Sequence, residues 1–163
     1  MKNNRQQNRL KYYDYSQNGA YFITICTKNR LNILCDIVGG GVLDAPRVTL
    51  LRYGIIVNET INEINRTYQH VNFDKYVIMP NHIHFIVIAN DNIGSSGTPT
   101  PTNMVIPKLI STFKRFVNKK VGKQIWQRGY YDHIIRNSID YERIWQYIDT
   151  NPIKWELDEY YTD

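Results

Sequence analysis

The sequence predicts an α+β domain in which strands and helices follow one another in the order β-α-β-β-α-β, with one more helix after the last strand. Runs of β-branched and aromatic residues recur between clusters of turn-forming residues, as expected for strands. Two segments between these runs repeat apolar residues every three to four positions, which predicts helices that pack one face on a sheet. A third helical pattern follows the final strand-like run.

The first strand and the first helix are separated by a segment rich in glycine. Residues 20–27, with the sequence AYFITICT, follow an Asn-Gly pair that favours a turn, and they predict the first strand. Residues 36–50 contain three consecutive glycines and a proline, so we expect an irregular loop or a short hairpin there. Isoleucines recur near helical spacing over residues 51–68, which predicts a helix.

The next two strands are expected to be joined by a tight turn. Residues 71–79 and 82–88 both have strand-like composition, and Pro80 and Asn81 lie between them. Proline is disfavoured inside a central strand, so it belongs at this turn. Residues 90–103, with the sequence NDNIGSSGTPTPTN, are dominated by small and turn-forming residues and predict a loop.

The last elements complete the predicted order. Apolar residues follow a helical stripe from residue 106 to 117, with Pro107 near the first turn, where proline is tolerated. Residues 130–136, with the sequence YYDHIIR, predict the fourth strand. Ser138 is expected to cap the last helix and Pro152 to end it. This order is that of the ferredoxin-like fold with an additional C-terminal helix.

Composition limits the class of protein. We expect one domain over residues 1–163, with a flexible basic N-terminus over about residues 1–18. The two cysteines, Cys26 and Cys35, indicate neither a disulfide framework nor a zinc knuckle. The sequence has no apolar run long enough to span a membrane, and its N-terminus lacks the apolar segment of a secretory signal. We therefore expect a cytoplasmic protein that does not contact membranes.

Charge is unevenly distributed along this chain, whose formal net charge is +5. Residues 105–136 hold eight lysines or arginines and one acid, Asp132. This concentration favours a polyanion such as nucleic acid as partner, although an ordinary solvated face explains it about equally well. Lys114 and Arg115 are the leading candidates to hold phosphate, because they flank the apolar stripe of their predicted helix. The candidate nucleic-acid contacts are Lys108, Lys114, Arg115, Lys119, Arg128 and Arg136.

A pair of histidines lies in the strand-like run MPNHIHFIVI, residues 79–88. His82 and His84 are two positions apart, so in a strand they point to the same side, roughly 6.5–7 Å apart along the chain. Two imidazoles on one face can converge on a single metal ion, or they can be polar side chains on a solvated face. The pair alone does not decide between these interpretations.

The final predicted helix carries a tyrosine beside its apolar stripe. Tyr147 lies about 110° from the middle of that stripe at 100° per residue, and Asn151 follows one turn later. Pro152 disfavours helical geometry at Asn151, so we expect this side chain on the unwinding end of the helix. The stripe, which should pack on the sheet, consists of Tyr141, Ile144, Trp145 and Ile148.

Together these segments resemble the single-strand nucleases with a His-hydrophobic-His motif and one catalytic tyrosine (HUH nucleases), and within them the REP-associated tyrosine transposases of the IS200-like family. The resemblance is carried, in order, by MPNHIHFIVI, by STFKRFVNK, and by IWQRGYYDHIIRN followed by DYERIWQYIDTNP. It extends from about Tyr21 to Pro152. It implies a metal-dependent single-stranded DNA endonuclease and strand transferase that acts through a 5′-phosphotyrosine intermediate on hairpin-forming repeat DNA.

The resemblance also implies roles for individual residues. His82 and His84 match the catalytic, metal-binding pair, Tyr147 matches the nucleophile, and Asn151 matches the third metal ligand. A divalent cation, Mg²⁺ or Mn²⁺, would suit this mixture of nitrogen and oxygen ligands. The expected partner is single-stranded or hairpin DNA. The protein is expected to be a monomer or a homodimer, with Tyr147 completing the site of its own chain or of a partner.

Two other functions are compatible with the predicted fold. The first is a non-catalytic module that binds single-stranded nucleic acid on its sheet, which would display aromatic side chains there. The segment YFITICT offers such aromatics, but the glycine-aromatic motif typical of that class is absent. The second is a small metal-dependent hydrolase, which would need a carboxylate beside the histidines. The predicted strand that carries His82 and His84 has none.

Overall fold

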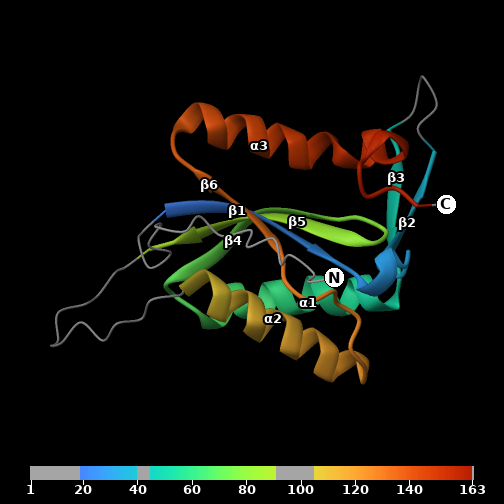
Figure 1. Cartoon of the computed structure of the whole chain (residues 1–163), viewed down its shortest axis with the longest axis horizontal. Helices are drawn as coiled ribbons and strands as arrows, with labels where there is room; N and C mark the ends of the chain where they lie inside the picture. The colour runs from blue at the N-terminus through green and yellow to red at the C-terminus, as the bar shows by residue number, and fades with distance from the viewer. Residues whose placement is uncertain (1–18, 40–44, 91–104, 163) are drawn as a thin grey trace, which may run out of the picture.

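The computed structural model describes residues 19–39, 45–90 and 105–162, and it contains a four-stranded antiparallel sheet between two layers of helices (Figure 1). Helices α1 and α2 cover one face of the sheet, and α3 covers the other. The sheet has the strand order β4-β5-β1-β6. Its elements are β1 (Gly19–Cys26), α1 (Arg52–Thr67), β4 (Val71–Ile78), β5 (His82–Ala89), α2 (Val105–Val121), β6 (Tyr131–Ile135) and α3 (Ser138–Thr150).

This architecture confirms the predicted ferredoxin-like order with an additional C-terminal helix. The glycine-rich segment forms a hairpin of β2 (Cys35–Val38) and β3 (Arg47–Leu50), one of the two expected possibilities. Two short 3-10 helices, η1 (Lys28–Arg30) and η2 (Asn151–Leu157), complete the described elements. The predicted N-terminal extension and nearly all of the predicted loop over residues 90–103 lie outside the described residues.

The pairing of β1 with β5 determines which side chains share a face of the sheet. Thr24 lies opposite His84, and Cys26 lies opposite His82. Because side chains alternate along a strand, the residues between these positions point toward α1 and α2 and bury the larger apolar cluster. The histidines instead point toward α3, in phase with Ile86. A smaller apolar cluster on that side consists of Phe22, Ile86, Ile135, Ile144 and Ile148.

Helix α3 has a different N-cap from the predicted one, and it ends at Thr150, just before Pro152, as predicted. Its N-cap is Asn137, whose side-chain oxygen accepts a hydrogen bond from the backbone N–H of Asp140 at 2.8 Å, so the expectation that Ser138 caps it was wrong. Asn151 keeps right-handed helical dihedrals despite the proline that follows. Pro152 sits at the start of η2, where its missing N–H costs no hydrogen bond. The chain therefore does not unwind at Asn151, which stays one turn after Tyr147.

Trp145 does not belong to the packed stripe of α3. Ile144 and Ile148 are buried and Tyr141 packs against them, but Trp145 is 37% exposed. Its ring lies under the ammonium group of Lys75, with the Nζ atom 3.6 Å from the ring centre. A cation over a tryptophan ring is a stabilising arrangement at a surface, so this residue is satisfied without burial. Within the described residues, no helix is both long enough and apolar enough to cross a membrane.

Candidate active site

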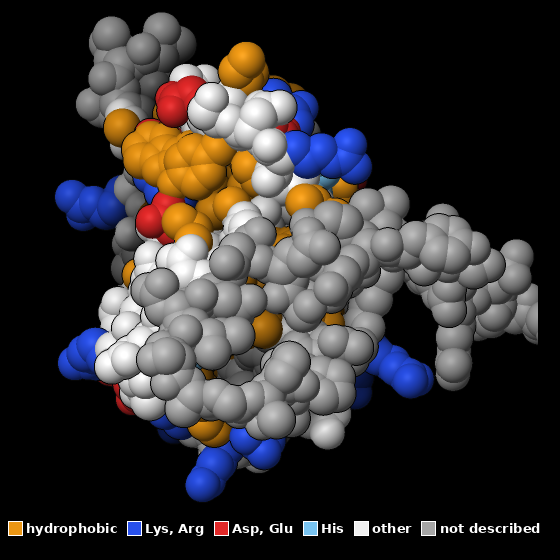
Figure 2. Space-filling model, turned by 90° about the vertical axis from the view of Figure 1, so that its left-hand side faces the viewer, with side chains coloured by type: hydrophobic (Ala, Val, Ile, Leu, Met, Phe, Trp, Pro, Cys, Tyr) orange, Lys and Arg blue, Asp and Glu red, His pale blue; other side chains and the backbone are white. Residues whose placement is uncertain are grey.

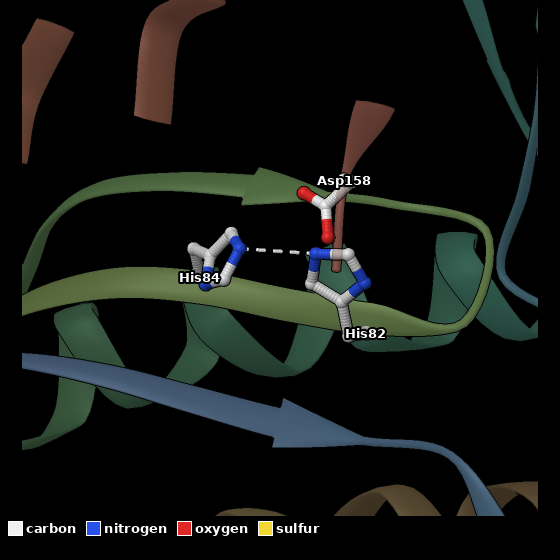
Figure 3. Close-up of side chains that lie close together, drawn as sticks. All are labelled: His82, His84 and Asp158. Carbon is white, nitrogen blue, oxygen red and sulfur yellow. Dashed lines mark hydrogen bonds between the residues drawn. The ribbon is translucent and has the colours of Figure 1, made fainter. Parts of the chain in front are cut away.

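His82 and His84 lie side by side on β5 with their rings turned toward each other (Figure 3). The two Nε2 atoms are 3.0 Å apart, and both side chains are buried. Two nitrogen lone pairs at this distance repel each other unless a proton or a cation lies between them. Two ligands at right angles, each about 2.1 Å from one ion, would be about 3.0 Å apart. The pair therefore fits two neighbouring positions of a single metal ion.

The orientation of His82 is fixed by its neighbour in the β4–β5 turn. Its Nδ1 atom is 2.9 Å from Oδ1 of Asn81. The Asn81 amide nitrogen already donates to the carbonyl oxygen of Tyr160 at 2.8 Å, so Oδ1 is the atom that faces the imidazole. Since this oxygen can only accept, Nδ1 of His82 carries the proton and Nε2 keeps its lone pair. Metal-binding histidines are commonly oriented by such a contact.

His84 is supported by β1. Its Nδ1 atom is 2.8 Å from the hydroxyl oxygen of Thr24, the residue opposite it in the sheet. Burial lowers the pKa of His82 to about 4, and burial followed by the neighbouring His82 lowers the pKa of His84 well below its ordinary value. Both imidazoles are therefore neutral at neutral pH, which is the form that binds metal ions.

Tyr147 reaches the histidine pair from α3. Its hydroxyl oxygen is 3.3 Å from Nε2 of His84, and its ring packs edge-on against Phe22 and His84. The side chain is 40% exposed, so it borders both the site and the surface. Burial, followed by the negative charges of Asp158 and Glu159, raises the pKa of Tyr147 to about 12. The phenol is thus a weaker acid here than in water, and it needs nearby positive charge to become a nucleophile.

Asn151 lies one helical turn after Tyr147, as the sequence indicates. The side chain is buried, and its Oδ1 atom has no hydrogen-bond partner among the described residues. Its amide nitrogen donates to Oδ2 of Asp158 at 2.9 Å. A buried carbonyl oxygen without a donor is costly, and a cation is one partner that would satisfy it. This unpaired oxygen fits the predicted role of Asn151 as a metal ligand.

Asp158 is a site residue that the sequence did not reveal. Figure 3 shows its carboxylate beside the ring of His82. The ligand atoms of His82, His84 and Asp158 lie within 4.8 Å of one another, so this group could hold a metal ion. Asp158 is 76 positions after His82, and no periodicity indicates that the chain returns to the sheet there. Acidic residues are frequent after Tyr147, but this composition does not single out Asp158.

The segment 158–162 lies across the histidines. The ring of Tyr160 is 4.6 Å from that of His82, measured between centres. Backbone carbonyls of the segment accept hydrogen bonds from the body of the protein. Arg30 donates to the carbonyl oxygen of Glu159 at 3.0 Å, and Asn32 donates to that of Thr162 at 3.0 Å. The segment is thus held by side chains of η1 and of the residues that follow it.

The predicted nucleic-acid contacts are not gathered at this site. Helix α2, with Lys108, Arg115 and Lys119, covers the opposite face of the sheet from α3. Lys114 is half-buried, and its ammonium group donates to the backbone carbonyls of Gln127 and Gly129. On the face shown in Figure 2, lysine and arginine side chains are spread around the outline, with no single basic patch among the described residues.

Arg128 and Arg136 are exposed on either side of β6 along the chain. His133, between them, contacts Asp140, with its Nε2 atom 2.8 Å from Oδ2 of that residue. Among the predicted site residues, His82, His84, Tyr147 and Asn151 therefore lie together, and Asp158 lies with them.

Comparison with known proteins places this geometry in a family. The family model described as "Transposase IS200 like" matches residues 15–151. An uncharacterized protein of Haemophilus influenzae is 34% identical over 175 residues, covering 98% of this chain and 94% of its own length. A REP-associated tyrosine transposase of Escherichia coli is 25% identical over 140 residues, covering 86% of this chain and 70% of its own length.

A solved structure has a similar fold. The structure of a REP-associated tyrosine transposase bound to a REP hairpin matches 90% of this chain and 74% of that chain, with a TM-score of 0.60. The sequence identity between the two is 21%, so this likeness concerns the arrangement of the backbone.

Proposed function

This chain belongs to the IS200-like transposase family, and we propose that it cleaves and rejoins single-stranded DNA through a covalent bond to Tyr147. It is a transposase of the single-tyrosine HUH type, and the residue roles below are our proposal. The observation that carries them is the position of the Tyr147 hydroxyl, 3.3 Å from a buried histidine pair and one helical turn before Asn151. We also propose that residues 1–163 form one domain. A cytoplasmic location stays a prediction.

The proposed reaction exchanges one phosphodiester bond for another. The Tyr147 oxygen attacks the scissile phosphorus, the bond from phosphorus to the 3′ oxygen breaks, and the phenolic proton ends on the released 3′-hydroxyl. The downstream strand remains attached as a 5′-phosphotyrosine. Because one ester replaces another, a DNA 3′-hydroxyl can reverse the step and join strands without ATP.

We propose that His82, His84 and Asn151 hold a divalent cation, Mg²⁺ or Mn²⁺. Bound there, the cation would supply positive charge to draw in a phosphate oxygen and to offset the burial that raises the pKa of Tyr147. The residues of the chain do the remaining work. Asn81 and Thr24 orient the imidazoles, and the rings of Phe22 and His84 fix the direction of the phenol.

The proposed partner is single-stranded or hairpin DNA. The family and the hairpin-bound relative support this, and five exposed basic residues remain proposed contacts with the DNA backbone. Lys114 differs from them because its ammonium group already bonds to two backbone carbonyls, so we propose that it positions the segment before β6. Whether the active protein is a monomer or a homodimer stays a prediction. The five contacts are Lys108, Arg115, Lys119, Arg128 and Arg136.

A second candidate function is favoured by Asp158. A carboxylate beside two metal-binding histidines could activate water, which would make the protein a phosphodiesterase without a covalent intermediate. The two reactions differ in whether a fragment of the cleaved strand stays bound to the protein. Only the tyrosine mechanism leaves a DNA fragment attached to protein.

The test is incubation of the protein with Mn²⁺ and a single-stranded hairpin oligonucleotide, followed by a denaturing gel. A 3′ label should appear on the protein, because the downstream fragment carries it, and the same oligonucleotide with a 5′ label should leave the protein unlabelled. Cleavage without labelled protein would favour the hydrolase. Labelling by the 5′-labelled strand would contradict the proposed polarity.

A further inference from the structure

The carboxylate of Asp158 is held in place by its own segment and by Asn151, the first residue of η2. Its Oδ1 atom accepts a hydrogen bond from the backbone N–H of Tyr160 at 2.7 Å. Its Oδ2 atom accepts one from the Asn151 amide at 2.9 Å. These protein contacts alone orient the group, and Figure 3 shows it beside the ring of His82.

The site is rich in electron pairs and poor in positive charge. Two neutral imidazoles and a carboxylate lie within 4.8 Å of one another, and Asn151, whose amide contacts that carboxylate, has a buried oxygen without a hydrogen-bond partner among the described residues. In the described part of the chain, no lysine or arginine forms an ion pair with Asp158. Arg30 lies close by, but its guanidinium group packs over the ring of Tyr160 and donates to the carbonyl oxygen of Glu159. A divalent cation would balance this arrangement.

The distances agree with one shared ion. Opposite ligands of an ion with oxygen and nitrogen donors are roughly 4 Å apart. The ligand atoms of His82, His84 and Asp158 lie within 4.8 Å of one another, so small side-chain adjustments would bring all three to one ion. Carboxylate oxygens are favoured ligands of Mg²⁺ and Mn²⁺.

We propose that Asp158 is a direct ligand of the metal ion and that the ion fastens the segment 158–162 over the histidines. This inference rests on the proposed function and adds a ligand from outside the sheet and the tyrosine helix. Ion binding and the position of the segment are thermodynamically linked. If contact with Asp158 raises the affinity for the ion by some factor, the bound ion must favour the position of the segment over the histidines by the same factor. The metal site and the C-terminal segment then act as one unit.

Mn²⁺ affinity measured by isothermal titration calorimetry tests the ligand role without any DNA. Asp158→Asn keeps the shape of the side chain and should weaken Mn²⁺ binding at least about tenfold. Glu159→Gln removes the same charge one residue away, from an exposed side chain, and should change affinity less than about twofold. His82→Ala reports on the metal site itself.

The outcomes separate the two proposals. Wild-type affinity in Asp158→Asn together with weak binding in His82→Ala would overturn the role of Asp158 and leave the metal site standing. Wild-type affinity in both variants would overturn the metal site. Equal losses in Asp158→Asn and Glu159→Gln would show a general charge effect and would also overturn direct ligation.

Hydrogen exchange provides a second test, whose first measurement uses the wild-type protein alone. Mn²⁺ should slow the exchange of backbone amides in residues 158–162 of the wild-type protein, while amides of α1 stay unchanged. The slowing should disappear in Asp158→Asn. Exchange in this segment that is indifferent to saturating Mn²⁺ would overturn the coupling.

Discussion

The two faces of the sheet bury different kinds of side chains, although the same strands build both. The face toward α1 and α2 buries a large apolar cluster that includes Ile23, Phe85 and Phe113. The face toward α3 buries only a small apolar cluster, and beyond it His82 and His84 take the positions where hydrocarbon would otherwise continue. The alternation of side chains along β5 thus places the main apolar core on one side of the sheet and the buried histidine pair on the other.

The largest expected effect separates chemistry from stability on the α3 face. Tyr147→Phe removes only a hydroxyl that borders the surface, so formation of the covalent adduct should fall at least about a thousandfold, or about 4 kcal/mol. Unfolding by urea should change by less than about 0.5 kcal/mol. The matched control is Tyr141→Phe, on the same helix, whose hydroxyl bonds to Asp74 instead. An adduct that survives in Tyr147→Phe and disappears in Tyr141→Phe would relocate the nucleophile.

The opposite face should show the reverse pattern. Phe113 is fully buried between α2 and the sheet, where it contacts the rings of Phe73 and Phe85. Phe113→Ala should lower the free energy of unfolding by about 3–5 kcal/mol in urea titrations. Mn²⁺ affinity of the folded fraction should stay near the wild-type value. A loss of metal affinity as large as that of His82→Ala would show that the two faces are not independent.

Acid should destabilise the protein through the α3 face. In the unfolded chain His82 titrates near 6.5, and burial lowers its pKa to about 4 in the folded protein. The unfolded state therefore binds more protons between these values. The stability that depends on a neutral His82 is complete above pH 6.5 and is lost as the pH falls toward 4, a loss of roughly 3 kcal/mol. Urea titrations at several pH values, with a chelator present, should show a smaller loss in His82→Gln. Equal losses in the two proteins would contradict this assignment.

The smallest expected effects concern DNA binding, and they show which surface of the protein contacts the DNA. Each phosphate contact contributes roughly −0.7 to the slope of log affinity against log salt for single strands. Arg136→Ala, at the end of β6, and Arg115→Ala, on α2, should each flatten the slope by about that amount. A change for Arg136 alone would place the DNA at the end of β6 and away from α2. An unchanged slope in both would place the DNA on another surface.

The order of elements could be predicted because it depends on local patterns. A strand or helix is predicted from the spacing of apolar residues within one short segment. Such spacing is present in the strand of His82 and His84, in α2 and in the helix of Tyr147. The proximity of Tyr147 to His84 follows once α3 packs on the sheet. Their catalytic roles stay predictions.

Other features depend on contacts that no local pattern contains. Asp158 reaches the histidines because the chain continues through η2 and turns back, held by carbonyl contacts with Arg30 and Asn32. The ammonium group of Lys114 donates hydrogen bonds to backbone carbonyls of the segment before β6, a contact between distant parts of the sequence. Trp145 lies at the surface because Lys75 of β4 covers its ring.

The support of His84 by Thr24 differs in kind from the support of His82 by Asn81. An amide oxygen accepts only, which ties the proton of His82 to one nitrogen, whereas a hydroxyl donates or accepts by rotating about a single bond. In the ion-free pair, His84 can place its proton on Nε2 toward His82 while Thr24 donates to Nδ1. With the proton moved to Nδ1, the same hydroxyl accepts it. His82 is thus held in one tautomer, whereas His84 can adopt either. Once its proton has moved from Nε2 to Nδ1 and the Thr24 O–H has turned to accept it, both Nε2 lone pairs would be available to one ion without any movement of a strand.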